Sequence, residues 1–443
     1  MKAPPIQPSA WRIDSRLVQW EQSKTAIFVS PTSARGRPNH NESSAKLLPG
    51  REQPLKKPMR IFAAASIVAA GVCLVLAQLV MELSNKSAAG RDFISYWAAG
   101  QLLVHGKNPY DFQAVRSLEA AAGRDPAKSL LMMRNPPVAF FVALPLGLVS
   151  PKTALIVWLF LLMAGLSLSI FLIWIMEGRP DNRYHLLGYV FAPALACFQA
   201  GQFGIFLLLG VVLFLYFHRT RPFIAGAALL LCSLKPHLFF PFGAVLMLWS
   251  ITAKRWRILA GLAAALAASC AVSYALDENA WTQYSQMMHA GGALDEPVPT
   301  LSVTLRFLIA PHAVWLQFVP QTAACLWAIW YFWTRRARWN WLDNGLIVLL
   351  AGAVCTPFGW LTDESMLLPA VMAGLYCALA AKRPWWPLAV IAAAALAELF
   401  FGPEITTRYF LWTTPAWLGW YLYATGRFGA RPAEGRVTAA AQG

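Results

Sequence analysis

The sequence predicts an all-α fold, a polytopic bundle of transmembrane helices, and three observations support this class. Hydrophobic residues make up 58% of the chain and charged residues only 13%, whereas a soluble domain carries roughly 25% charged residues. Apolar runs recur at lengths close to the roughly 20 residues that cross a bilayer. Basic clusters separate these runs, as is typical of cytoplasmic loops. The net charge of +16 therefore indicates membrane topology, and no nucleic-acid partner is expected.

A polar tail precedes the first apolar run. Residues 1–59 are rich in Pro, Ser, Lys and Arg, and residues 1–60 hold eleven Lys or Arg against four Asp or Glu. This composition predicts a disordered basic cytoplasmic tail, with contact to anionic lipid as the alternative. Because the first apolar run begins only at Ile61, we expect no cleavable signal peptide. Residues 60–425 form the expected transmembrane domain, with an outer loop at 84–150, and residues 426–443 form a short cytoplasmic tail.

The apolar runs predict about twelve spans, within a range of roughly 10–14. The first is Ile61–Leu83, and the basic residues just before it hold its start in the cytoplasm. The stretch Pro136–Val149 is apolar but short and rich in proline, which predicts an interfacial or re-entrant segment. The other expected spans are 152–176, 186–200, 203–217, 222–234, 236–250, 257–276, 313–333, 342–356, 364–380, 385–401 and 406–423.

Six basic clusters support this topology, because alternating spans place all of them on the cytoplasmic face. Both termini then lie in the cytoplasm as well. The clusters are Arg179 with Arg183, Arg219 with Arg221, Lys254-Arg255-Trp256-Arg257, Arg335-Arg336-Ala337-Arg338, Lys382-Arg383, and the tail with Arg427, Arg431 and Arg436.

The ionisable residues that lie near the apolar runs but outside these clusters fall on the outer face. Such residues are costly at a membrane and indicate function. Asp92 is one of them, and Phe93, Tyr96, Trp97 and Gly100 follow it at helical spacing, which predicts an amphipathic helix at the interface. Asp92 has two interpretations of equal weight, as the N-cap of this helix or as a functional carboxylate.

Two cations and two further acids share the predicted outer face. Lys235 ends an apolar run just before His237, Arg134 precedes two prolines, and Asp363 and Glu364 lie between two late spans. For Lys235 the structural alternative is a lysine that snorkels to the membrane surface. Each cation alone is more often structural, but cations and acids together on one face favour a phosphate-binding site.

Several motifs follow one another in a defined order. They are Asp92-Phe93-x-x-Tyr96-Trp97-x-x-Gly100-x-x-Leu103-x-x-Gly106-x-x-Pro109-Tyr110-Asp111, then Arg134-Asn135-Pro136-Pro137 with Pro145-Leu146, then Gly201-Gln202, then Leu234-Lys235-Pro236. Together they resemble glycosyltransferase family 87, the polyprenyl-phosphate-mannose-dependent mannosyltransferases of the GT-C superfamily, over about residues 90–370.

The resemblance implies a GT-C fold and an inverting transfer, which turns a β-linked polyprenyl-phosphate sugar into an α-glycoside. It also implies an aspartate near the catalytic centre in the first outer loop, which matches Asp92. Some members carry a Ser-Pro-x-Ser-Trp motif closely followed by His. Here the segment Thr356–Trp360 is followed instead by Asp363 and Glu364. The histidine role therefore does not carry over, and the identity of donor and acceptor stays open.

The chemistry of such a transfer assigns expected roles to these residues. A base takes the proton of the acceptor hydroxyl, and cations stabilise the departing phosphate. We expect Asp92 to be the base, and Lys235, Arg134 and His237 to bind the donor phosphate. The expected sugar or acceptor contacts are Gln202, Asp363, Glu364, Tyr96 and Asn135. No cofactor is expected; no metal-ligand spacing is present, so no metal is assigned, although a divalent ion stays open.

The predicted function is transfer of a sugar, expected to be mannose, from a polyprenyl-phosphate donor to a lipid or glycan acceptor. The expected location is the outer face of the bacterial cytoplasmic membrane. A lipid or solute transporter or flippase is the main alternative, and it predicts mid-span charges and internal repeats, of which no clear repeat is visible. The second alternative is a membrane acyl- or phosphotransferase that uses a histidine as its base. No candidate histidine has a convincing partner in the sequence; the four candidates are His105, His237, His289 and His312.

The seven cysteines are scattered without C-x-x-C spacing and mostly lie within apolar runs. We therefore expect small buried side chains rather than disulfides or metal ligands.

Overall fold

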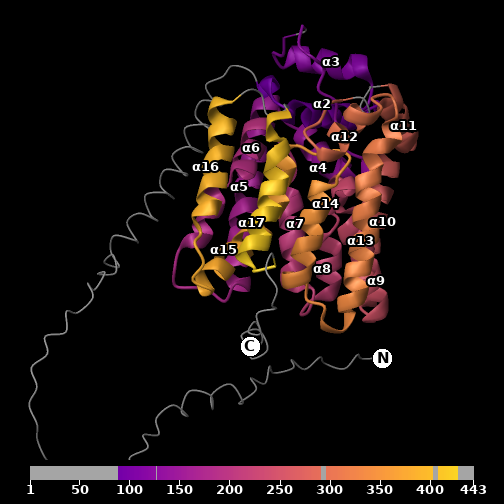
Figure 1. The fold of residues 1–443 in the computed structure, drawn as a ribbon. Helices are drawn as coiled ribbons and strands as arrows, with labels where there is room; N and C mark the ends of the chain where they lie inside the picture. The colour runs from indigo at the N-terminus through magenta and orange to yellow at the C-terminus, as the bar shows by residue number, and fades with distance from the viewer. Residues whose placement is uncertain (1–87, 126, 291–295, 403–407, 428–443) are drawn as a thin grey trace, which may run out of the picture. The chain divides into compact units, whose positions relative to one another are not determined.

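The computed structural model describes residues 88–125, 127–290, 296–402 and 408–427. Every regular element in these ranges is helical, which confirms the predicted all-α fold. The first predicted span, Ile61–Leu83, and both predicted cytoplasmic tails lie outside the described residues, apart from the first two residues of the C-terminal tail. Figure 1 shows the long helices of the described part running side by side, with α2, α3, α11 and α12 gathered near one end of them.

The first half of the described chain contains shorter helices around one long one, α5. Its elements are η2 (Ala88–Gly90), α2 (Phe93–Val104), α3 (Phe112–Ala121), η3 (Pro137–Ala139), α4 (Phe140–Gly147), α5 (Pro151–Met176), η4 (Tyr184–Val190), α6 (Ala192–Ala200), α7 (Gly204–Phe217), α8 (Pro222–Ala228), η5 (Cys232–Leu234), η6 (Pro236–Phe239) and α9 (Phe240–Thr252).

The second half begins with another long helix, α10, and closes the bundle. Its elements are α10 (Trp256–Leu276), α11 (Ala280–Ala290), α12 (Leu301–Ile309), η7 (Val314–Phe318), α13 (Val319–Arg335), η8 (Arg336–Arg338), the π-helix η9 (Trp341–Gly345), α14 (Leu346–Val354), η10 (Leu361–Leu367), α15 (Leu368–Ala380), α16 (Trp386–Phe401), η11 (Arg408–Trp412) and α17 (Thr413–Ala424).

Three segments of the described residues are long and apolar enough to cross a membrane. They are α5, α10 and the continuous pair η10 and α15, which spans Leu361–Ala380. Seven further apolar helices of 10–17 residues are shorter. The expected break between 222–234 and 236–250 is present at Lys235-Pro236, where η5 ends and η6 begins. Proline lacks the N–H that a continuous helix needs, so the helix ends there.

The helix predicted after Asp92 is present as α2, but its surroundings differ from the expectation of an amphipathic interfacial helix. Ten of its twelve residues are buried. It crosses α4 where Gly100 meets Gly147, and a Cβ on either glycine would lie 2.0–2.1 Å from backbone atoms of the other helix. The amphipathic pattern belongs instead to α3, which buries Val115 and Glu119 and exposes most of its other side chains.

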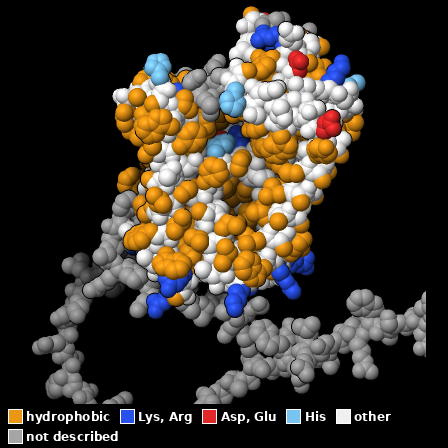
Figure 2. Space-filling model, turned by 90° about the vertical axis from the view of Figure 1, so that its right-hand side faces the viewer, with side chains coloured by type: hydrophobic (Ala, Val, Ile, Leu, Met, Phe, Trp, Pro, Cys, Tyr) orange, Lys and Arg blue, Asp and Glu red, His pale blue; other side chains and the backbone are white. Residues whose placement is uncertain are grey.

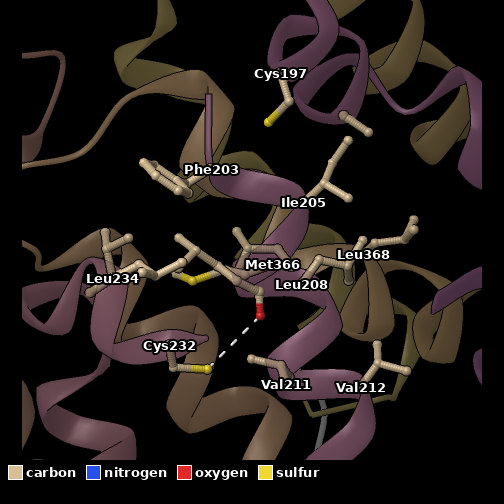
Figure 3. Close-up of a cluster of buried hydrophobic side chains, with 14 of the residues drawn as sticks. Cys197, Phe203, Ile205, Leu208, Val211, Val212, Cys232, Leu234, Met366 and Leu368 are labelled. Carbon is tan, nitrogen blue, oxygen red and sulfur yellow. Dashed lines mark hydrogen bonds between the residues drawn. The ribbon is translucent and has the colours of Figure 1, made fainter. Parts of the chain in front are cut away.

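An apolar core surrounds α7, which is apolar on all sides and packs against α5, α8 and η10. Figure 3 shows its side chains meeting those of Leu234, Met366 and Leu368, with the Cys232 thiol 3.9 Å from the carbonyl oxygen of Leu207. Of the six described cysteines, Cys197 and Cys232 are buried and carry free thiols. This core fixes the position of the segments on either side of α7, including the turn that carries Gln202.

Candidate active site

The turn between α6 and α7 brings three parts of the chain together. Gly201 ends α6 with a positive φ of 70°, a conformation that glycine adopts without strain. A Cβ at Gly201 would lie 2.6 Å from the Cβ of Phe93, and one at Gly204 would lie 2.0 Å from the carbonyl oxygen of Thr362. The turn therefore touches both the start of α2 and η10, and Gln202 lies between them.

Asp92 lies at the start of α2, yet its side chain makes no capping hydrogen bond. Its Oδ2 instead accepts a hydrogen bond from the side-chain amide of Gln202, across 110 residues of sequence. Asp111 shows the contrast, because its side chain caps α3 through two backbone N–H groups at 2.9 Å. Of the two interpretations of Asp92, the geometry supports the one in which the carboxylate belongs to a tertiary site.

Burial has the largest influence on the pKa of the Asp92 carboxyl. Loss of water raises the pKa of its carboxyl, and this effect exceeds the opposing influence of the Gln202 hydrogen bond and of the positive charges of Lys235, Arg124 and Arg134. The net pKa is therefore raised above the ordinary value for aspartate. A carboxylate held in this way is a better proton acceptor than one at the protein surface.

Lys235 points into the same network rather than snorkelling to the surface. Its Nζ donates to Oδ1 of Asp363 at 2.6 Å and to Oε1 of Gln202 at 3.4 Å. Only 12% of the Lys235 side chain and 3% of the Asp363 side chain are exposed. Tyr96 completes the network, because its hydroxyl donates to Oε1 of Gln202 at 2.9 Å.

The five residues of this network, Asp92, Tyr96, Gln202, Lys235 and Asp363, lie at or near the starts of helices. Asp92 directly precedes α2, Gln202 lies two residues before α7, and Lys235 directly precedes η6. Asp363 lies in the first turn of η10, which continues into α15. Helix N-termini present unpaired N–H groups and a partial positive charge. Their meeting point, which also contains an ammonium group, is suited to an anion such as phosphate.

Three other predicted residues surround this network without joining it. Arg134 forms an ion pair with Glu296, and 43% of the Arg134 side chain is exposed. Asn135 donates from Nδ2 to the carbonyl oxygen of Leu234 at 2.8 Å, so it holds the backbone beside Lys235. The ring of His237 lies 5.8 Å from that of Phe358, edge to face.

The adjacent acids Asp363 and Glu364 point to different places. Asp363 accepts from Lys235 and from the backbone N–H of Trp360, at 2.6 and 3.2 Å. Both carboxylate oxygens of Glu364 are used by α17, with the Thr413 hydroxyl at 2.5 Å and the Trp417 indole N–H at 2.9 Å. Glu364 therefore joins η10 to α17, and only Asp363 belongs to the network.

A small pocket borders Asp363 and Glu364. Its lining includes Thr300, Thr356, Trp360 and Thr414, which offer hydroxyl groups and an aromatic face to a polar ligand. The Thr356–Trp360 segment stands out in the sequence, whereas Thr300 and Thr414 do not, because a single threonine in a distant segment belongs to no motif. Figure 2 shows a hollow in the upper half of the molecule, with His and Lys or Arg side chains inside it and apolar side chains around and below it.

Among the described residues, no group of three or more His, Cys, Asp or Glu side chains is placed to hold a metal ion. The arrangement that is present combines a proton acceptor, a nearly buried ammonium group and several helix N-termini. It can take a proton from a hydroxyl group and stabilise an anionic leaving group.

Comparison with known proteins identifies a family for the chain. No curated protein and no solved structure matches the chain. The family model described as glycosyltransferase family 87 matches residues 134–357, which is half of the chain. The matched part includes Arg134, Gln202 and Lys235, whereas Asp92 and Asp363 lie outside it. With its helical membrane bundle, the chain belongs to glycosyltransferase family 87 of the GT-C superfamily.

Proposed function

We propose that this glycosyltransferase moves a sugar, expected to be mannose, from a polyprenyl-phosphate donor to a lipid or glycan acceptor. The observation that carries the proposal is the network of Asp92, Gln202, Lys235 and Asp363, in which the carboxylate of Asp92 and the ammonium of Lys235 contact the same amide. This convergence at the starts of the helices favours a transferase over a transporter, which needs a polar path across the bilayer.

In the proposed reaction, Asp92 is the general base. It takes the proton of the acceptor hydroxyl as that oxygen forms a bond to the anomeric carbon. The bond between the anomeric carbon and the phosphate oxygen breaks on the opposite side, and the polyprenyl phosphate leaves with the electron pair. The configuration at the anomeric carbon is inverted. A base positioned in this way contributes typically about 10²–10⁴ in rate.

In the same reaction, Lys235 stabilises the negative charge that develops on the phosphate. The helix N-termini around it add partial positive charge, and Arg134 supplies a second cation when it exchanges Glu296 for the phosphate. Asp363 holds the Lys235 ammonium in place and contacts sugar hydroxyls from the border of the small pocket. His237 follows Lys235 by two residues and supports the phosphate or the sugar.

The distribution of charge supports an active site on the outer face of the bacterial cytoplasmic membrane. Gln202, Lys235 and Asp363 lie near the N-terminal ends of α7, α9 and α15. Exposed basic residues follow the C-terminal ends of the same helices, at Arg219, Lys254 and Lys382. Figure 2 shows Lys and Arg side chains along the lower edge of the molecule, away from the hollow. Because excess Lys and Arg indicate the cytoplasmic side, the network lies on the opposite side.

The proposal is tested with the purified full-length protein in proteoliposomes. Radiolabelled polyprenyl-phosphate mannose is supplied with membrane lipid extract as acceptor, and a nucleotide-sugar donor serves as the control. We expect label to enter an acceptor only from the lipid donor, and the product to be cleaved by an α-mannosidase. Transfer from the nucleotide sugar alone would refute the lipid donor, and a β-linked product would refute inversion.

A further inference from the structure

The side-chain amide of Gln202 is the one group that contacts both expected catalytic partners, Asp92 and Lys235, among the described residues. Its nitrogen donates to the Asp92 carboxylate, and its oxygen accepts from the Lys235 ammonium and from the Tyr96 hydroxyl. An amide oxygen has two lone pairs, so the oxygen of Gln202 is fully used within the protein.

The charges on either side fix the direction of this amide. If it were reversed, its –NH₂ group would face the ammonium of Lys235, and its carbonyl oxygen would face the carboxylate of Asp92. Both contacts would be repulsive, because an ammonium only donates and an ionised carboxylate only accepts. Gln202 therefore holds one orientation, with its polar ends matched to the two charges.

The main-chain position of Gln202 is equally constrained. The preceding Gly201 has a positive φ, and its carbonyl oxygen accepts a hydrogen bond from the Trp158 indole at 2.9 Å. Gly204 lies against the backbone of Thr362 so closely that no larger residue fits. Both the main-chain position of Gln202 and the orientation of its side-chain amide are therefore fixed. A residue that holds a reacting group in place needs both.

We propose that Gln202 is a positioning residue that couples the base to the phosphate-binding cation, rather than a residue that binds sugar. Its N–H holds the Asp92 carboxylate towards the acceptor, and its oxygen holds Lys235 within reach of that carboxylate. When a donor phosphate engages Lys235, the positive charge that faces Asp92 is neutralised, so the carboxylate becomes more basic once the donor is in place. This inference rests on the proposed function of the site.

The coupling has a signature that a merely structural glutamine lacks. The Gln202 hydrogen bond lowers the pKa of Asp92 against the effect of burial, so its loss must raise that pKa further. The other charged or titratable groups around Asp92 are Lys235, Arg124, Arg134 and Tyr96. Two of them, Lys235 and Tyr96, lose a hydrogen bond to Gln202 in the same substitution. Displacement of Lys235 would also raise the pKa of Asp92, because its positive charge lowers that pKa. The acid side of the pH–rate profile therefore reports on the coupling through Gln202 as a whole.

The test compares Gln202→Met with Gln101→Met in the full-length protein, using polyprenyl-phosphate mannose and membrane extract. Gln101 lies on α2 and donates to the carbonyl oxygen of Gly147 at 2.5 Å, so it is a matched structural glutamine. For Gln202→Met we expect kcat to fall roughly tenfold at neutral pH. We also expect the acid limb of the plot of kcat against pH to move to higher pH. For Gln101→Met the acid limb stays in place, whatever the change in melting temperature.

A second variant keeps the proposal testable if Gln202→Met does not fold. Gln202→Glu preserves the shape and the contact with Lys235 but places a negative group against Asp92, so its acid limb should move to higher pH as well. An unchanged acid limb in an active Gln202→Met or Gln202→Glu protein would overturn the coupling. Absence of transfer from the lipid donor by the unmodified protein would instead overturn the proposed function, so the two failures are distinguishable.

Discussion

Replacement of Lys235 by methionine separates the role of this residue in catalysis from its role in the fold. The side chain is only 12% exposed and pairs with Asp363, which is 3% exposed. Loss of one electrostatic contact to a developing charge typically lowers the rate about 10²–10³-fold, which corresponds to roughly 2.7–4 kcal/mol. We therefore expect Lys235→Met to lose at least about 10² in kcat/KM, with weaker donor binding.

The same substitution also destabilises the protein, because it leaves a buried carboxylate without its cation. Removal of one partner of a buried ion pair costs about 3–5 kcal/mol. The double variant Lys235→Met with Asp363→Asn removes both charges and should recover most of the melting temperature. It should not recover activity, since the phosphate still lacks its ammonium. The assay measures kcat/KM, donor affinity and melting temperature for both variants and for the single Asp363→Asn.

Two results would refute this reasoning. One is donor affinity in Lys235→Met equal to that of the unmodified protein, which would show that the ammonium does not contact the phosphate. The other is recovery of activity in the double variant, which would show that the loss in the single variant came from misfolding.

Three further expectations concern the acids Asp92 and Glu364. Asp92→Asn should lower kcat by about 10²–10⁴ while donor binding is retained, and robust turnover in that variant would exclude Asp92 as the base. In the unmodified protein, kcat should fall on acidification at a pH above the pKa of an ordinary aspartate, because the raised pKa of Asp92 means that the base is protonated earlier as the pH drops. A pH–rate profile measures this. An acid limb at the ordinary pKa of aspartate would contradict it. Glu364→Gln should cost about 1–3 kcal/mol of stability, because it weakens the hydrogen bonds from Thr413 and Trp417, and thermal unfolding measures this loss. The same variant should lower kcat/KM far less than Asp363→Asn does. Equal losses of kcat/KM in the two variants would contradict the separate roles of Asp363 and Glu364.

The sequence was sufficient to predict the class of fold and to single out the charged residues that meet in the candidate site. Apolar runs and basic clusters are local patterns, and they persist whatever the helices pack against. Asp92 and Lys235 could be singled out because an ionisable group beside an apolar run is costly. Their meeting at Gln202 depends on a turn that is fixed by contacts of Gly201 and Gly204 with distant segments, and no local pattern encodes such contacts.

The same limit explains where the expectations and the structure differ. Asp363 and Glu364 are neighbours and have the same chemistry, so sequence alone gave them one role. On the helical turn of η10 they face different elements, Lys235 on one side and α17 on the other. The helix after Asp92 has amphipathic spacing, but α4 covers part of its surface through the Gly100–Gly147 contact, and periodicity does not report what a neighbouring helix covers.

The most direct test of the central claim is a cryo-EM structure of the Asp92→Asn variant with polyprenyl-phosphate mannose bound. A phosphate within hydrogen-bonding distance of the Lys235 Nζ, with the anomeric carbon of the sugar facing residue 92, is the expected result. A phosphate bound away from Lys235, or a sugar turned away from residue 92, would contradict the proposed site.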